Sequence, residues 1–272
     1  MTVFQTTGHV GLRVTLAGGE VSVETSDQQG VEIGLVPLRD NEVTRKAITE
    51  ARVEMTDRGG GHEVVVHVAK SSGFLIGRGS KVGVRVRCPG GSDLCLRASS
   101  ADFEATGTLG VVDVKTVSGD VSLENVGTLE VATVSGDVLV RDVVGTLDLR
   151  TASGDATVHR CRGGLSANLV SGDLSVGESA AGLAVATVSG DVRVHAAGGG
   201  TMRIQSVSGD VRLAIKPGER LYIDASSVSG TMSSELDLDD GPPADPTVPV
   251  VELRVRTVSG DLEIVRAAAV TA

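Results

Sequence analysis

The tripeptide Ser-Gly-Asp recurs along this chain at nearly constant spacing, and this repeat restricts the possible folds more than any other feature. Counted from serine to serine, five successive spacings are 17, 18, 18, 18 and 19 residues. A unit this short cannot bury an apolar face alone, so such repeats stack on their neighbours. The serines of the motif are Ser118, Ser135, Ser153, Ser171, Ser189, Ser208 and Ser259. Ser100-Ala101-Asp102 and Ser229-Gly230-Thr231 are imperfect copies.

Each repeat has the pattern of a strand, a tight turn, a second strand and a second turn. Leu129 and Val131 precede one Ser-Gly-Asp turn, and Val138 and Val140 follow it, with the period-two alternation of half-buried strands. Glycines mark the second bend, at Gly127, Gly145, Gly164 and Gly182. Because identical side chains recur at identical phases, we expect an all-β fold, a parallel β-solenoid with coils of about 18 residues. A meander of antiparallel hairpins is the alternative.

Residues 1–97 lack the repeat, and we expect them to form a β-rich N-terminal capping region that covers the first coil. Apolar alternation predicts strands here, at Val10–Leu16, Glu20–Glu24, Val31–Val36, Val64–Ala69 and Val82–Arg87. One short helix is predicted at Glu42–Ala51, with Asn41 as its N-cap. The solenoid repeats are expected to occupy residues 98–265, and a tail residues 266–272.

The last repeat spacing is 30 residues long because it contains the acidic, proline-rich segment 237–249. Its Asp239-Asp240-Gly241-Pro242-Pro243 run has the composition of a loop. We therefore expect an insertion into the last coil, followed by a closing pair of strands at Val251–Thr257 and Asp261–Val265.

Charge and cysteine usage restrict the partners and the compartment. The formal net charge is −10 and no long basic cluster is present, so a nucleic acid backbone would be repelled. Neither a signal peptide nor an apolar run long enough to span a membrane is seen, and we expect a cytoplasmic location with no integral membrane segment. The three cysteines, Cys88, Cys95 and Cys161, are too few and too scattered for a disulfide framework.

The recurring Thr-Val-Ser-Gly-Asp-Val, with Val86–Leu94 before the repeats and Thr257–Leu262 closing them, resembles the bacterial putative-adhesin repeat proteins, also called toastrack domains. The resemblance covers nearly the whole chain, and it implies a β-solenoid scaffold. In other members it implies membrane segments and a link to envelope stress or adhesin-like roles. It supplies no catalytic residues.

The aspartates of the repeat are the one candidate metal site, because stacked coils would bring neighbouring carboxylates within about 5 Å of each other. Adjacent carboxylates could share Ca²⁺, which prefers oxygen ligands. The favoured interpretation is that each aspartate instead accepts hydrogen bonds from backbone amides or serine hydroxyls, since one carboxylate per coil is few for a calcium repeat. The residues are Asp120, Asp137, Asp155, Asp173, Asp191 and Asp210.

No other motif points to chemistry. His159 and His195 share a phase but should lie two coils apart, too far to bind one metal. Aromatics are 1% of the chain, which disfavours a sugar-binding or sugar-cleaving site. We expect no enzymatic activity and no cofactor, and predict a scaffold that binds a protein partner. A self-assembling oligomer or filament, and a Ca²⁺- or glycan-binding solenoid, are the alternatives.

Overall fold

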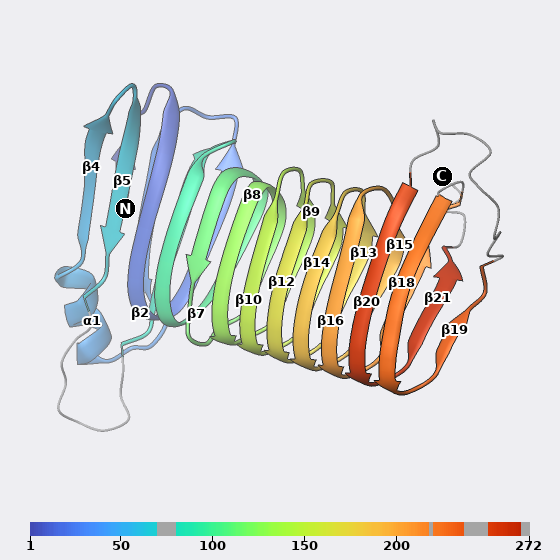
Figure 1. Cartoon of the computed structure of the whole chain (residues 1–272). Helices are drawn as coiled ribbons and strands as arrows, with labels where there is room; N and C mark the ends of the chain where they lie inside the picture. The colour runs from blue at the N-terminus through green and yellow to red at the C-terminus, as the bar shows by residue number, and fades with distance from the viewer. Residues whose placement is uncertain (70–79, 218–219, 237–249, 268–272) are drawn as a thin grey trace. The chain divides into compact units, whose positions relative to one another are not determined.

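The computed structural model describes residues 1–69, 80–217, 220–236 and 250–267, and these residues form an all-β fold in which most neighbouring strands are parallel (Figure 1). Contacts divide the chain into two compact units, Met1–Val140 and Arg141–Ala272. Within each unit, equivalent strands of successive repeats pair in parallel. The predicted parallel β-solenoid is therefore confirmed, and the hairpin meander is excluded for the repeats.

The first unit contains a bent strand that pairs with three others. Strand β2 (His9–Ser26) lies beside β7 (Asp93–Lys115) in parallel along most of its length. On its other side, its first half pairs with β5 (Gly61–His67) and its second half with β6 (Val82–Pro89). Strand β8 (Val121–Ser135) pairs with β7 in turn. The remaining strands of this unit are β1 (Thr2–Phe4), β3 (Val31–Pro37) and β4 (Arg52–Arg58), and β9 (Val138–Val143) begins at its end.

The bend of β2 corresponds to a Ser-Gly-Asp turn without its usual residues. Gly18 and Gly19 align with Ser100 and Ala101, and Glu20 aligns with Asp102. Gly19 has φ +140°, in the range of the repeat glycines. The two strands predicted at Val10–Leu16 and Glu20–Glu24 are thus halves of one bent strand.

The described residues contain one helix, α1 (Glu42–Thr49), which lies against β3 and β6. The Oδ1 atom of Asn41 accepts a hydrogen bond from the backbone N–H of Thr44 at 2.7 Å, as an N-cap residue does. The predicted helix and its cap are confirmed, while β4 was not predicted because its residues are mostly exposed and charged.

The second unit has two parallel sheets that enclose an aliphatic core. One sheet contains β10 (Leu147–Ser153), β12 (Leu165–Ser171), β14 (Leu183–Ser189), β16 (Thr201–Ser208), β20 (Val250–Ser259) and β18 (Arg220–Ser229), in that spatial order. The other contains β11 (Ala156–Cys161), β13 (Leu174–Ser179), β15 (Val192–Ala197), β17 (Val211–Ile215), β21 (Leu262–Arg266) and β19 (Met232–Ser234). Leu174 and Val192 are direct partners and are both buried, as the repeat predicts.

The order of the last two coils corrects the sequence prediction. Strands β20 and β21 were expected to close the stack, but they lie between the coil of β16 and β17 and the coil of β18 and β19. The burial of the inward residues follows from this order. Val251, Leu253 and Val255 of the inner strand β20 are fully buried, whereas Leu221 and Ile223 of the terminal strand β18 are only half-buried. The predicted loop 237–249 lies outside the described residues, as do residues 268–272 of the predicted tail.

Candidate functional site

The Ser-Gly-Asp turns form the repeated feature of the surface, and each needs its glycine for two reasons. Gly190 has φ +136°, which side chains of L-residues rarely adopt. A Cβ atom at Gly190 would also lie 2.1 Å from the backbone oxygen of Gly172 in the neighbouring coil. A buried threonine before the turn forms a hydrogen bond with it. The hydroxyl of Thr151 donates to the carbonyl oxygen of Ser153 at 3.2 Å.

The aspartates of these turns form a ladder of hydrogen bonds between coils. In each step the Oδ1 atom of one aspartate accepts from the backbone N–H of the aspartate in the next coil. In the first unit, Asp102 accepts from Asp120 and Asp120 from Asp137, at 3.1 and 2.9 Å. In the second unit, the ladder runs through Asp155, Asp173, Asp191, Asp210 and Asp261 to the N–H of Thr231, at 2.7–2.9 Å.

The contacts of the carboxylates offset the repulsion between neighbouring negative charges in the ladder. Each Oδ1 atom binds a backbone N–H, and a hydrogen bond to a carboxylate is stronger than one between neutral groups. Arg193 adds a positive charge, with its guanidinium 2.6 Å from Asp191 Oδ2 and 3.5 Å from Asp173 Oδ2. Among the residues that the structure describes, no group of three or more His, Cys, Asp or Glu side chains is arranged to hold a metal ion. Cation binding by the six predicted aspartates stays a hypothesis, and their backbone contacts account for the motif without it.

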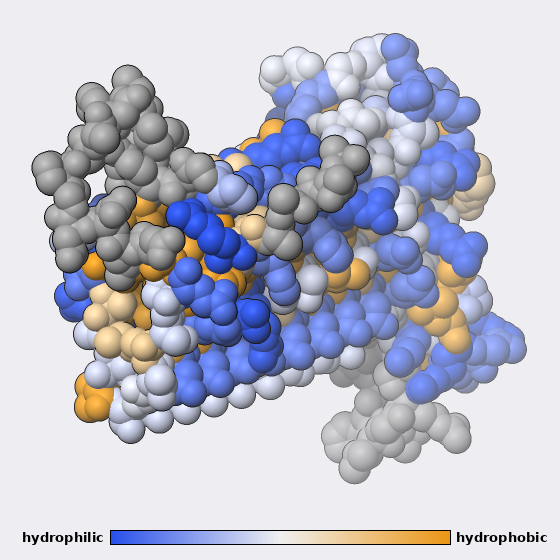
Figure 2. Space-filling model, turned by 90° about the vertical axis from the view of Figure 1, so that its right-hand side faces the viewer, coloured by the Kyte–Doolittle hydropathy of each residue, from blue (hydrophilic) through white to orange (hydrophobic). Residues whose placement is uncertain are grey.

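A column of exposed valines runs beside the aspartate ladder. We use the name valine column for Val170, Val188, Val207, Val258 and Val228 of the second unit. Each immediately precedes the serine of a turn, and those serines are in register between neighbouring coils. The first four valines are 50–54% exposed and Val228 is 82% exposed. Val117 and Val134 occupy the same position in the first unit. On the face seen in Figure 2, apolar residues form patches within a largely hydrophilic surface.

Sequence reasoning missed the valine column although its signal is present. Thr187 and Thr257 are buried, so the valine that follows each of them must point outward from the strand. The alternation therefore assigns the polar residue to the interior and the apolar one to the solvent. Without this alternation, the valines of the column cannot be told from core valines by residue type alone.

The histidines and cysteines form no site together. His159 and His195 are exposed, and each is aligned with Gly177 in the coil between them, as their shared phase predicts. The three cysteines are free thiols. Burial raises the pKa of Cys88 to about 11, although a hydrogen bond from Ser92 opposes the shift. Burial also raises the pKa of Cys161. Neither thiol is activated as a nucleophile, because a nucleophile needs a lowered pKa.

Glu178 of β13 is paired with two cationic side chains. Glu178 contacts Lys216 at 2.5 Å and Arg160 at 3.0 Å. The hydrogen bond from Lys216, then that from Arg160, lowers the pKa of the Glu178 carboxyl. Glu178 is therefore charged at neutral pH, which suits an ion pair and is the opposite of what a general acid requires.

The comparisons with known proteins agree with this architecture. The family model Toastrack DUF4097 matches residues 10–265, so the chain belongs to a toastrack family of β-repeat proteins. The resemblance read from the repeats is confirmed. No curated protein matches the chain significantly. Among the described residues, no helix is both long and apolar enough to cross a membrane.

Solved structures that are similar to the chain over most of its length share little sequence with it. A putative adhesin of Bacteroides fragilis is 12% identical with a TM-score of 0.48, over 96% of this chain and 95% of that one. A putative adhesin of Parabacteroides distasonis is 13% identical with a TM-score of 0.39, over 97% of this chain and 95% of that one. Similarity this low gives no information about function.

Proposed function

We propose that this toastrack protein is a non-enzymatic scaffold that binds a protein partner through the valine column. The observation that supports this is the exposure of the same apolar side chain at the same place in successive coils. Exposed apolar residues in a row are typical of interaction surfaces, since isolated ones need no explanation but contiguous ones do. A partner that covers the column would gain the burial of five valine side chains.

The residues beside the column would supply specificity. The next outward positions along the strands carry Asn168, Gln205 and Arg256, and the aspartate ladder lies beyond the turn on the other side. An apolar centre with a polar rim is the common anatomy of a protein interface. In an adhesin-like role, the partner that binds this surface would lie on another cell. In a cytoplasmic role, the partner would lie in the cytoplasm. The cytoplasmic location stays a prediction that cell fractionation would test.

The test is a pull-down with three forms of the full chain from lysate of the source organism. The double variant Val188→Lys with Val207→Lys places two charges in the middle of the column. Val144→Lys is the matched control, because Val144 is 57% exposed but lies outside the column. We expect at least one protein to bind both the wild-type chain and the control variant and not to bind the double variant. Identical sets of retained proteins for all three forms would refute it.

A second candidate function is self-association, and the terminal coil favours it. Within the described part of the chain, β18 pairs on one side only, with β20, and its inward residues Leu221, Ile223 and Ala225 are only half-buried. An open sheet edge can pair with another chain. Sedimentation over a wide concentration range tests this candidate: a monomer at every concentration excludes it, and an oligomer that Ile223→Lys dissociates supports it.

A further inference from the structure

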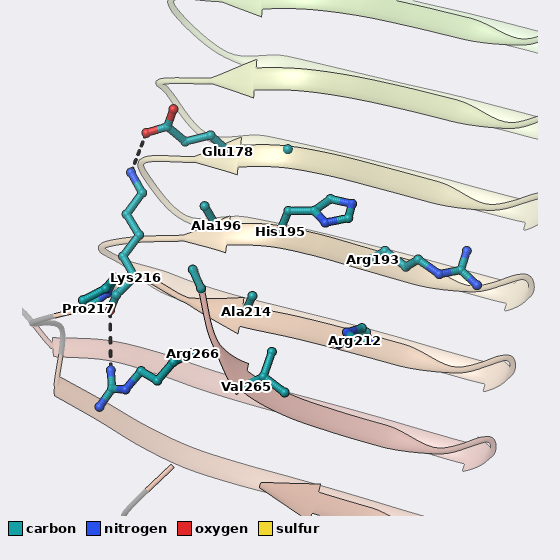
Figure 3. Close-up of a pocket in the computed structure, with 12 residues that line it drawn as sticks. Glu178, Arg193, His195, Ala196, Arg212, Ala214, Lys216, Pro217, Val265 and Arg266 are labelled. Atoms are coloured by element: carbon teal, nitrogen blue, oxygen red, sulfur yellow. Dashed lines mark hydrogen bonds and ion pairs between the residues drawn. The ribbon is translucent and has the colours of Figure 1, made fainter. Parts of the chain in front are cut away.

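A groove on the outer face of the second unit has features that the proposed scaffold does not use. It crosses β13, β15, β17 and β21, and its volume is about 1030 Å³. That volume is close to the upper end of the range of small-molecule sites, which is about 300–1,000 Å³. Figure 3 shows its lining residues on these successive strands.

The floor of the groove is aliphatic because small residues occupy outward positions of the strands. Ala214, Val265 and Ala267 form an apolar cluster with Ala196 packed against it. Ala214, Val265 and Ala267 are 9%, 8% and 7% exposed, although Ala214 and Val265 follow core residues along the strands and Ala267 follows the end of β21. In β13, Gly177 contributes no side chain at the position level with His195, and Glu178 is the residue aligned with Ala196. The groove thus exists where bulky outward residues are missing.

Long cationic side chains form both walls. Arg193 and Arg212 lie on one side of Ala196 and Ala214, and Lys216 and Arg266 lie on the other, as Figure 3 shows. Glu178 is the one carboxylate among the lining residues that the structure describes. The groove therefore has a positive lining on a chain whose formal net charge is −10.

The cations differ in how far they are neutralised. Arg193 is paired with Asp191, Arg212 with Glu263 at 3.3 Å, and Lys216 with Glu178. Arg266 donates a hydrogen bond to the backbone carbonyl of Lys216 at 3.5 Å, and within the described residues it forms no ion pair with a carboxylate. A guanidinium in this state can bind an incoming carboxylate through two parallel hydrogen bonds.

We propose that this groove binds an anionic amphiphile, a straight alkyl chain with a carboxylate head group. The alkyl chain lies on Ala196, Ala214, Val265 and Ala267, and the head group pairs with Arg266. A peptide fits less well because its backbone N–H and C=O groups would need partners. The floor offers aliphatic side chains, and the backbone groups of these strands already pair with one another. A cationic amphiphile is disfavoured by the walls.

Isothermal titration calorimetry of the full chain tests the proposal, with dodecanoate as the probe, below its critical micelle concentration. Dodecyltrimethylammonium is the control ligand, since it has the same chain length and the opposite charge. The expected result is saturable binding of dodecanoate at one site per chain and no saturable binding of the cation. The absence of saturable dodecanoate binding, or equal affinity for the two ligands, overturns the proposal.

Three variants locate the site. Arg266→Glu reverses the charge expected to hold the head group, and Ala196→Leu fills part of the floor. Each is expected to weaken dodecanoate binding by at least about ten-fold, on the scale of a lost charge-assisted contact. Arg203→Glu is the matched control, because Arg203 is exposed on β16 of the other sheet, and it should bind as the wild type does. Thermal unfolding of each variant verifies that it folds. Unchanged affinity in both Arg266→Glu and Ala196→Leu, or equal loss in all three variants, overturns the assignment.

Discussion

The Oδ1 atom of Asp191 accepts a hydrogen bond from the backbone N–H of Asp210 in the next coil, at 2.9 Å. The same relationship connects Asp173 with Asp191 at 2.8 Å. The aspartate of each repeat thus accepts a hydrogen bond from a backbone N–H of the next coil. This bond lies at the turn, where the regular pairing of the strands is interrupted. The aspartate of the motif holds adjacent turns in register, and this explains its recurrence along the stack.

The first prediction concerns the removal of one such contact. Asp191→Ala leaves the N–H of Asp210 without this acceptor and removes one of the two carboxylates that contact Arg193, so it should lower the free energy of unfolding by about 1–3 kcal/mol. Asp191→Asn keeps an acceptor oxygen in place and should cost less. Urea denaturation followed by circular dichroism measures both values. A loss equal in the two variants would mean that the charge, and not the hydrogen bond, is what the turn requires.

The second prediction separates glycines that the fold needs from those that it does not. Gly190→Ala combines an unfavourable φ with a 2.1 Å approach to the oxygen of Gly172, and it should cost about 4 kcal/mol or more. Gly164→Ala is the control, because its Cβ would meet nothing within 4 Å and its φ is ordinary. It should be neutral or stabilise by up to about 1 kcal/mol. Thermal unfolding should therefore give a melting temperature well below that of the wild type for Gly190→Ala. For Gly164→Ala it should give one equal to or above that of the wild type.

The third prediction tests the dry interior of the first unit. Val138 is 2% exposed, and Val138→Asp would bury a charge without a partner there. It should cost about 3–5 kcal/mol, because an unpaired buried charge is among the most destabilising changes. Glu130→Gln should be nearly silent, since Glu130 forms only an exposed ion pair with Lys115 at 3.7 Å. Similar unfolding midpoints for the two variants would show that Val138 is not held in a packed core.

The sequence predicted the repeats well because stacking makes the period visible. Leu174 and Val192 could be placed side by side in neighbouring coils from their position in the repeat alone, and so could the aspartates of the turns. The bend of β2 could not, since Gly18-Gly19-Glu20 contains neither the serine nor the aspartate of the motif. A local signal was still present: two glycines followed by an acid and Val21 repeat the turn chemistry in altered form.

The order of the final coils was unpredictable for a different reason. Chain order and spatial order usually agree in a solenoid, so Val251–Thr257 was placed after Ser229. The sequence pattern does not distinguish the two coils, because both have a Ser-Gly turn preceded by alternating apolar residues. The groove beside Arg266 was missed because Ala196, Ala214 and Val265 come together only when three coils are aligned.

The fourth prediction concerns metal binding by the aspartate ladder. Calcium at millimolar concentration should leave the melting temperature unchanged, because one oxygen of each aspartate already accepts a backbone hydrogen bond and one carboxylate per coil leaves too few ligands. Scanning calorimetry with calcium and with a chelator measures this. A calcium-dependent rise that Asp191→Asn abolishes would instead establish the ladder as a cation site, since ligands that bind only the folded state raise its stability.

The fifth prediction concerns the cysteines. With a pKa of about 11, Cys88 has roughly one thiolate in a thousand molecules at pH 8, and both Cys88 and Cys161 are buried. Because folding raises these pKa values, the folded state loses stability only as the pH rises above 9, the ordinary thiol value. A thiol reagent at pH 8 should therefore label only the half-buried Cys95 quickly, and all three thiols after unfolding in guanidinium. Cys95→Ser should remove the fast reaction. Rapid labelling of two thiols in the native protein would show that a core column containing Cys88 or Cys161 opens readily.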